Sequence, residues 1–345
     1  MRIAVLVPSF VEFSGDARVA ELQVRELVGR GNQVKVYALV SNMKPTDADV
    51  LTFGMPKNPL VQRVYRLLLP LNIFLTLKWL YISRKQDLII CHLYPMTWLG
   101  FVSKLFLKVR YVFWFHGLEE PEVFNKTHER IYMSLHILLT KVTTRNVDKA
   151  VSVSHFAEEK LRKYTGLPSD VVYNKADPLR FHLGLDGSAV RQRYNINDAP
   201  VILFVGRLAP QKGVHLLIQA FGLVKKKIPD AKLVVVGDPT FNYYFKHLKD
   251  ISDDSVILAG HISSQEIPYY YAMCDIYATC SLWENCNLPV LEAQACGKPV
   301  VAFNIDAFKE NSNEKIVLVE KLSLDRFSEA CIDTIRRVRC TALGK

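Results

Sequence analysis

Residues 199–227 read APVILFVGRLAPQKGVHLLIQAFGLVKKK, and the fold class follows from the pattern in this stretch. Ala199–Gly206 is a continuous apolar run that ends at a glycine, which is typical of a parallel strand buried on both faces. After a short loop, Val214–Lys227 carries apolar residues at helical spacing. A strand, a loop and a helix in this order form the repeating unit of a parallel sheet that is covered by helices.

The same unit recurs on both sides of this stretch. The other expected strands are Arg2–Pro8, Gln33–Val40, Asp87–His92, Arg110–His116, Lys149–Ser154, Ala231–Gly237, Ser255–Ala259, Cys274–Cys280 and Pro299–Phe303. The other expected helices are Ala17–Gly29, His155–Tyr164, Gln265–Ala272, Leu288–Cys296 and Leu324–Val338. The rhythm breaks near residues 174–198, where Asp, Pro and Gly residues interrupt it. We therefore predict an N-terminal Rossmann-like domain over 1–175, a linker region over 176–198 and a C-terminal Rossmann-like domain with a final helix over 199–345.

The fold class is thus α/β, with two Rossmann-like domains that we expect to face each other across a cleft. Ligands of such sheets bind outside the carboxyl ends of the strands, so the cleft is the expected site. A length of 345 residues agrees with two domains, at about 150 residues each. Apolar residues make up 50% of the chain and charged residues 23%, which excludes disordered and collagen-like classes.

The net charge is +10, and much of the excess lies in one apolar-rich stretch. Residues 51–115 contain nine Lys or Arg and one acid, Asp87. Such a surface favours an anionic partner, namely lipid headgroups, phosphates or nucleic acid, although a solvated basic face is the simpler interpretation. The apolar run Leu67–Ile82 has 16 residues, fewer than the ~20 that span a bilayer, and we predict a buried or surface-lying helix there.

The cysteines and the N-terminus indicate a cytoplasmic protein, and the inner membrane surface is one location that we consider for it. Seven cysteines without a Cys-x-x-Cys pair favour a reducing compartment and give no sign of a zinc ribbon or a disulfide framework. The apolar run Ile3–Val7 is followed at once by Pro8, so it is too short for a signal-peptide core.

A candidate phosphate site follows the strand Ala199–Gly206. Arg207 and Lys212 are five positions apart in the loop before the next helix. Two cations at the carboxyl end of a strand, beside a helix N-terminus, form an anion site. Arginine contacts phosphate at two points, and lysine supplies a mobile point charge. The alternative is a solvated loop with two incidental charges.

A second candidate segment is Ser281–Val301. Asn287 is suited to the N-cap of a helix, and Gly297 to its end. The start of that helix, with its positive dipole end, would then face the ligand. Glu284 in the preceding loop and Glu292 in the helix are good acceptors for sugar or ribose hydroxyls. The alternatives are an exposed loop acid and an acid that balances the helix dipole.

Two more candidates lie near the N-terminus. His116 follows a buried strand and precedes a glycine, which favours the ligand edge over the core. The alternative is a structural histidine, which is the commoner role of an isolated one. Gly15, between the first strand and the first helix, lets backbone N–H groups approach a phosphate or sugar. No Gly-x-Gly-x-x-Gly or Walker A sequence is present, which argues against a dehydrogenase or a P-loop enzyme. Asp47 and Asp49 do not follow a strand, and we predict no metal and no other cofactor.

Taken together, these motifs resemble the retaining, nucleotide-sugar-dependent glycosyltransferases of family 4, which have the GT-B fold of two Rossmann-like domains. The resemblance covers nearly the whole chain in the right order. It rests on Gly15–Val34, Ala150–Glu158, Asn174–Asp177, the loop Gly206–Gly213, and the glutamates 284 and 292. It implies a nucleotide-diphosphate sugar as donor substrate and an acceptor bound by the N-terminal domain.

The resemblance also implies roles for the site residues. Arg207 and Lys212 would bind the donor pyrophosphate and stabilise it as it leaves, and Glu292 would hold the ribose hydroxyls. Glu284 would contact hydroxyls of the transferred sugar, and His116 would line the reaction centre. The Gly15 loop would approach phosphate and sugar through its amides. No protein nucleophile is assigned.

One departure from the family concerns the sugar. The family usually has Glu-Gly-Phe-Gly where this chain has Glu284-Asn285-Cys286-Asn287, and the lost glycines change how closely a sugar approaches the backbone.

Three functions remain open at this point. The first is hexosyl transfer to a membrane-associated acceptor such as a lipid-linked glycan or glycolipid, which the basic stretch 51–115 favours. In that case the protein touches an anionic membrane peripherally, unless Leu67–Ile82 is an ordinary core helix. The second is the same reaction on a soluble sugar. The third is a non-catalytic protein that binds nucleotides or nucleic acid, although no nucleic-acid motif occurs and we expect no nucleic-acid partner.

Overall fold

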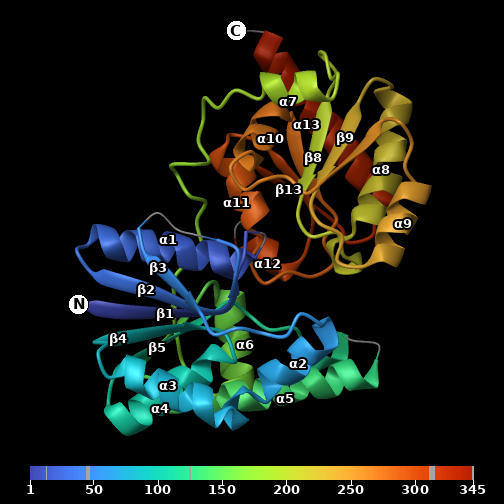
Figure 1. Ribbon diagram of the computed structural model, residues 1–345. Helices are drawn as coiled ribbons and strands as arrows, with labels where there is room; N and C mark the ends of the chain where they lie inside the picture. Colours follow the sequence, from blue (N-terminus) through green and yellow to red (C-terminus); the bar gives the residue numbers. More distant parts are fainter. Residues whose placement is uncertain (13, 44–46, 124–125, 311–314, 344–345) are drawn as a thin grey trace. The chain divides into compact units, whose positions relative to one another are not determined.

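The computed structural model describes the chain except for residues 13, 44–46, 124–125, 311–314 and 344–345 (Figure 1). The chain forms two compact units, Met1–Asn174 and Lys175–Lys345. Each unit is a parallel β-sheet with helices on both of its faces, so the predicted α/β class is confirmed. The predicted linker, 176–198, contains the short helix α7 (Ser188–Arg193) and belongs to the second unit.

Within the described residues of the first unit, seven parallel strands follow the order β3-β2-β1-β4-β5-β6-β7. They are β1 (Arg2–Phe10), β2 (Gln33–Ser41), β3 (Asp49–Thr52), β4 (Leu88–His92), β5 (Arg110–Phe115), β6 (Lys149–Ser152) and β7 (Asp170–Val171). The order reverses at β1, where β2 lies on one side and β4 on the other. Such a reversal is the point at which parallel sheets bind ligands.

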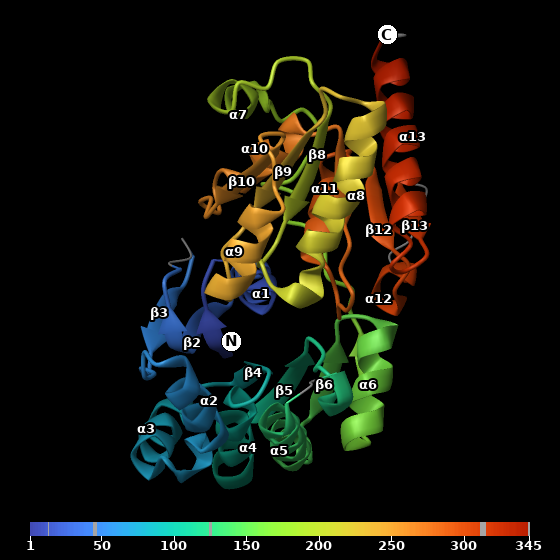
Figure 2. The same ribbon diagram turned by 90° about the vertical axis from the view of Figure 1, so that its right-hand side faces the viewer.

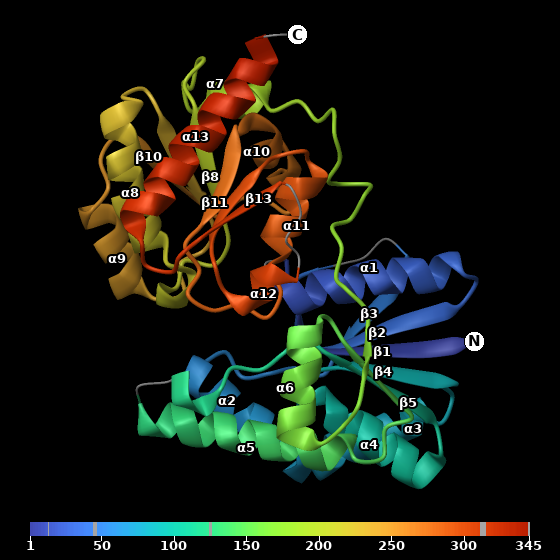
Figure 3. The same ribbon diagram turned by 180° about the vertical axis from the view of Figure 1, so that it is seen from behind.

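The helices of the first unit are α1 (Gly15–Gly29), α2 (Pro59–Leu67), α3 (Ile73–Ser83), α4 (Met96–Leu107), α5 (Thr127–Thr144) and α6 (His155–Thr165), with short 3₁₀ turns η1 (Leu69–Leu71) and η2 (Pro121–Val123). Helix α1 lies on one side of the sheet, and α3, α4 and α5 lie on the other (Figures 1 and 3). Ala17, Ala20 and Val24 of α1 are buried on β1 and β2, as their helical spacing requires.

The single helix predicted over Leu67–Ile82 is wrong. Helix α2 ends at Leu67, η1 follows, and α3 begins at Ile73. Pro70 lacks a backbone N–H, and the Asn72 side chain caps α3 by accepting a hydrogen bond from the Leu75 amide at 3.0 Å. Nor is α3 an ordinary core helix, because Trp79 is buried whereas Phe74 is 88% exposed.

In the second unit, the described residues form six parallel strands in the order β10-β9-β8-β11-β12-β13. They are β8 (Val201–Val205), β9 (Lys232–Val236), β10 (Val256–Gly260), β11 (Ile276–Thr279), β12 (Val300–Phe303) and β13 (Ile316–Val319). The helices besides α7 are α8 (Val214–Lys227), α9 (Asn242–Asp250), α10 (Ile267–Met273), α11 (Leu288–Ala295), α12 (Asp306–Lys309) and α13 (Leu324–Leu343), with the 3₁₀ turn η3 (Pro210–Lys212).

The core of the second unit joins its sheet to α8, α9 and α13. Helices α8 and α13 lie side by side on one face of the sheet (Figures 1 and 2). The Asp275 carboxylate accepts hydrogen bonds from the Val201 amide at 2.7 Å and from the guanidinium groups of Arg191 and Arg339 at 3.2 and 3.0 Å. This one carboxylate therefore ties the start of β8, α7 and α13 together.

Candidate functional site

Two loops of the second unit leave neighbouring strands at the same edge of the sheet. One follows β8 and contains Gly206–Gly213, and the other follows β11 and leads into α11. The Leu282 amide donates to the Gln211 carbonyl at 2.9 Å, which joins the loops. Gly213 has a φ of +64°, and a Cβ there would lie 2.0 Å from the Cys280 carbonyl oxygen. Only glycine permits so close an approach.

The loop that follows β8 exposes one of the two predicted cations, Arg207, to solvent. Leu208 is fully buried, and its amide donates to the Asp238 carbonyl at 2.8 Å, which anchors the loop beside the end of β9. Arg207, immediately before it, is exposed. A fixed backbone with an exposed guanidinium is a suitable arrangement for an anion.

The structure brings Lys212 and Glu284 together, although they are 72 residues apart in the chain. The Lys212 ammonium lies 2.7 Å from each oxygen of the Glu284 carboxylate. Glu284 is 6% exposed, and it also accepts from the Ser281 hydroxyl at 2.9 Å and the Asn287 amide at 3.0 Å. It is thus not an exposed loop acid, and these hydrogen bonds hold its carboxylate rigidly, while Oε2 accepts from Lys212 alone among the described residues.

Glu292 lies in the middle of α11 and is buried. The Tyr271 hydroxyl, at the end of α10, donates to its carboxylate at 2.9 Å. Glu292 therefore has a fixed tertiary partner and does not simply balance the dipole of α11. The position of that partner, 21 residues earlier, gives no signal in the sequence.

Asn287 stands at the N-cap position of α11, but its side chain accepts no hydrogen bond from the helix. The amide nitrogen is used for Glu284 instead. In the described part of the chain, the Oδ1 atoms of Asn285 and Asn287 are buried without a hydrogen-bond partner. A buried acceptor left unpaired costs about 1–3 kcal/mol, so a ligand that donates hydrogen bonds at these atoms would be favoured.

The first unit brings Gly15 and His116 to the carboxyl edge of its own sheet. His116 follows β5, and Gly15 is the exposed first residue of α1. Burial lowers the pKa of His116 to about 4, while the Asp16 carboxylate at the start of α1 acts in the opposite direction. The imidazole is therefore neutral at pH 7 and lies near the N-terminus of α1.

Sequence reasoning missed His92, which ends β4 beside β5. Its Nδ1 lies 2.8 Å from Nε2 of His116, and its own Nε2 lies 3.0 Å from Oε1 of Gln23 in α1. Burial holds the pKa of His92 well below its usual range. The strand-end argument that selects His116 applies equally to His92 and would have found it.

Within the described residues, no three His, Cys, Asp or Glu side chains lie close enough to hold a metal ion. Asp49 belongs to the edge strand β3 and is paired with Lys35 of β2 at 3.2 Å. No helix in the portion that the structure describes is both long and apolar enough to cross a bilayer.

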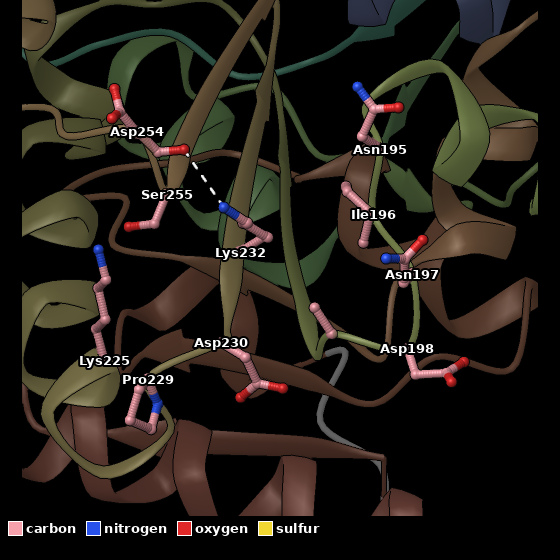
Figure 4. A pocket seen from close by; sticks show the side chains of 11 residues that line it. Asn195, Ile196, Asn197, Asp198, Lys225, Pro229, Asp230, Lys232, Asp254 and Ser255 are labelled. Carbon is pink, nitrogen blue, oxygen red and sulfur yellow. Dashed lines mark hydrogen bonds between the residues drawn. The ribbon is translucent and has the colours of Figure 1, made fainter.

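A polar pocket of about 510 Å³ lies at the opposite edge of the second sheet, among the segments that lead into β8, β9 and β10 (Figure 4). Lys225, Lys232 and Asp254 are among its lining residues, and none of the predicted site residues lines it. The candidate site is therefore the carboxyl edge, where Arg207, Lys212, Glu284 and the start of α11 meet.

Two sequence families match the chain over most of its length. The family described as Glycosyl transferases group 1 matches residues 188–336, and the one described as Glycosyltransferase Family 4 matches residues 13–179.

Curated relatives include the putative glycosyltransferase YtcC of Bacillus subtilis, 33% identical over 46% of this chain and 44% of its own length. The GDP-mannose-dependent alpha-(1-6)-phosphatidylinositol monomannoside mannosyltransferase of Mycolicibacterium smegmatis is 34% identical over 33% of this chain and 32% of its own length. The corresponding monoacylated-substrate enzyme of Corynebacterium glutamicum is 30% identical over 60% of this chain and 58% of its own length. The chain thus matches between about a third and three fifths of these relatives.

Solved structures extend the similarity to the fold of nearly the whole chain. Anabaena HepE, in complex with UDP and glucose, has a TM-score of 0.79 at 21% identity, and the match covers 98% of this chain and 91% of HepE. WaaG, a glycosyltransferase involved in lipopolysaccharide biosynthesis, has a TM-score of 0.76 at 14% identity, with 98% and 92% covered. At these identities the similarity shows the fold alone.

Proposed function

Because the chain belongs to the group 1 and family 4 glycosyltransferases and has their GT-B fold, we propose that it is a retaining hexosyltransferase. It moves a hexose from a nucleotide-diphosphate sugar to an acceptor hydroxyl on a membrane lipid-linked glycan or glycolipid. The observation that carries the proposal is the Lys212–Glu284 pair, which joins the two loops at the carboxyl edge of the second sheet, one of which also exposes Arg207.

The chemistry of the reaction explains why cations are needed there. As the glycosidic bond breaks, negative charge builds on the departing nucleoside diphosphate, and fixed positive groups stabilise it. Arg207 and Lys212 supply this charge to the pyrophosphate. Glu292 accepts hydrogen bonds from the ribose hydroxyls, and Glu284 accepts hydrogen bonds from hydroxyls of the transferred sugar. In the first unit, His116 contacts the sugar, and the backbone amides of the Gly15 loop contact phosphate and sugar.

Nucleotide binding tests the donor half of the proposal. We expect the diphosphate of one nucleoside, among UDP, GDP and ADP at millimolar concentration, to raise the unfolding temperature of the protein. A ligand at 100 times its Kd adds ~2.7 kcal/mol of stability. Arg207→Ala should abolish most of this shift, because it removes a two-point phosphate contact from an exposed position.

Arg326→Ala is the matched control, since the Arg326 side chain is also exposed and is paired with Glu320, which follows the edge strand β13, separated from β8 by β11 and β12. It should leave the nucleotide shift unchanged. A folded wild-type protein that gains no stability from any of the three nucleotides would rule out the donor assignment.

The lipid acceptor is supported by one surface of the first unit. Helices α2 and α3 and the turn η1 expose large apolar side chains, which we call the α2–α3 face: Leu60, Val61, Val64, Leu68, Leu71, Ile73, Phe74, Leu77 and Tyr81. Helix α5, which contacts α2, adds Ile131, Leu135 and Leu138. An apolar surface of this extent is normally covered by a partner.

The charges around this face favour an anionic bilayer as that partner. Residues 51–115 contain nine Lys or Arg and one acid, Asp87, which is paired with Arg2. Lys78, Arg84 and Lys85, in and after α3, are exposed. Apolar side chains flanked by cations bind favourably at the boundary between headgroups and acyl chains, because the cations attract anionic headgroups. The names of the similar mannosyltransferases also include a lipid, phosphatidylinositol monomannoside.

Vesicle binding tests the membrane contact. We expect the wild-type protein to sediment with vesicles that contain phosphatidylglycerol, and less so with phosphatidylcholine alone or at high salt. The double substitution Leu71→Ser and Phe74→Ser should weaken binding by tenfold or more, since each buried side chain contributes ~1.5–3 kcal/mol. Leu179→Ser, in the second unit, is matched in exposure (75% against 71% for Leu71) and should have no effect.

Absence of vesicle binding at low salt would contradict the membrane contact. Self-association through the α2–α3 face would then explain why its apolar side chains are exposed. Equal kcat/KM on soluble and vesicle-borne acceptors would contradict the lipid acceptor while leaving the donor half intact.

A further inference from the structure

Three side chains of the first unit form one continuous line of hydrogen bonds. Gln23 lies in α1, His92 ends β4, and His116 follows β5. Gln23 Oε1 lies 3.0 Å from His92 Nε2, and His92 Nδ1 lies 2.8 Å from His116 Nε2. The ring centroids lie 5.1 Å apart and the ring planes are inclined by 24°, so the two imidazoles meet edge to edge through these nitrogens.

The direction of each hydrogen bond follows from the inventory of donors. The Gln23 Oε1 atom can only accept, so His92 donates from Nε2. His92 is fully buried, and burial holds its pKa well below the usual range, so the ring is neutral and has a single N–H. Its Nδ1 is therefore an acceptor, and His116 must donate to it from Nε2.

The same reasoning fixes the free end of the line. Burial lowers the pKa of His116 to about 4, so this ring is also neutral at pH 7. With its one proton on Nε2, its Nδ1 keeps an unprotonated lone pair. That atom can accept a hydrogen bond from a hydroxyl, and it cannot donate one. The opposite tautomer would reverse this preference.

We propose that Gln23 and His92 are positioning residues that lock His116 in the Nε2–H tautomer, so that its Nδ1 accepts a hydrogen bond from a hydroxyl of the transferred sugar. The proposal rests on the proposed function for the contact between His116 and the sugar. His92 has no exposed surface with which to touch a substrate, so it acts through its hydrogen bond to His116. His116 is the group that touches substrate.

The tautomer can be read directly, without any assay of activity. We expect ¹⁵N-histidine NMR at pH 7 to show His92 and His116 as neutral rings that both carry their proton on Nε2. The chain contains nine histidines, and the spectra of His92→Asn and His116→Asn assign the two signals. A proton on Nδ1 of His116, or a cationic ring, would overturn the proposal even if the enzyme is active.

Variants separate positioning from simple packing. Asparagine at position 92 retains an amide oxygen near the place of Nδ1, so His92→Asn should keep His116 on the Nε2–H tautomer. His92→Leu should release His116 to exchange between tautomers and lower kcat by about tenfold, with the KM for the donor little changed. Gln23→Leu should lower kcat to a smaller degree, because it leaves the His116 contact to residue 92 in place.

Equal kcat in the Asn and Leu variants of His92, with both folded, would overturn the positioning role. If the wild-type protein transfers no sugar, the NMR result still decides whether the line of hydrogen bonds exists, so failure of the proposed function is recognised separately.

Discussion

Lys212→Met is expected to lower kcat by 10²–10³-fold, which is about 3–4 kcal/mol of lost transition-state stabilisation. Lys212 Nζ lies 2.7 Å from both Glu284 oxygens, so its position is fixed before any donor arrives. A fixed cation costs no reorganisation when charge develops on the leaving diphosphate. Steady-state kinetics with the nucleotide sugar that carries the stabilising nucleoside diphosphate would measure the loss.

Stability must be separated from catalysis in this experiment. Glu284 is 6% exposed, and Lys212→Met leaves its carboxylate without a cation, which costs about 3–5 kcal/mol of folding free energy. The double variant Lys212→Met, Glu284→Gln removes both charges. It should regain most of the free energy of unfolding in urea, yet its turnover should stay as low as that of the single variant.

Lys225→Met serves as the control for lysine removal in the same unit. Lys225 lies at the end of α8 and pairs with the exposed Asp253 at 2.9 Å. Its loss should change stability by no more than about 0.5 kcal/mol and leave kcat unchanged. A Lys212→Met protein that keeps a third or more of the wild-type kcat would remove Lys212 from the catalytic machinery.

Much of the fold could be predicted because strands buried on both faces are unmistakable in sequence. β1, β8 and β9 are almost wholly apolar, and each has a neighbouring strand on both sides in its sheet. The edge strand β3 was missed because Asp49–Thr52 is mostly exposed and reads as a polar loop. The edge strand β13 was missed although Ile316–Val319 is apolar, since its four residues give too short a signal beside a long final helix.

The site could be predicted only as far as motifs with local spacing extend. Arg207, Lys212 and Glu284 lie in loops that follow strand ends, and Glu292 lies in the helix after the second loop, so local position is enough to select them. Their partners come from elsewhere in the fold.

The Tyr271 hydroxyl donates to Glu292 from the end of α10, and Gln23 reaches His92 from α1. Such contacts depend on how elements pack, which no spacing in a single sequence reveals. The buried Oδ1 atoms of Asn285 and Asn287, which have no hydrogen-bond partner among the described residues, likewise depend on packing that the sequence does not reveal.

Acidification from pH 6.5 to 4.5 is expected to destabilise the first unit much more than the second. His92, His116 and His136 all lie in the first unit, and burial lowers the pKa of each. An unfolded histidine has a pKa of about 6.5, so the unfolded chain takes up protons first as the pH falls. The stability from these neutral rings is therefore complete above pH 6.5 and is lost toward the folded pKa of about 4 that His116 and His136 share.

His136 gives the clearest magnitude. It is buried in α5, where the rings of Tyr94 and Tyr132 pack against it, and the Arg66 guanidinium also disfavours its charged form. Its pKa of about 4 corresponds to about 3 kcal/mol of stability at neutral pH. In the second unit burial also lowers the pKa of His215, which is only partly buried, so a smaller loss is expected there.

Tryptophan fluorescence can follow the first unit alone. Three of the four tryptophans, at positions 79, 98 and 114, lie in it, and Trp283→Phe removes the fourth. Urea unfolding of this variant should show a midpoint that falls steeply between pH 6.5 and 4.5. His136→Gln keeps a side chain that can donate a hydrogen bond but cannot become charged in this range. It should therefore flatten the pH dependence, and a slope equal to that of the parent would show that His136 is not buried as a neutral ring.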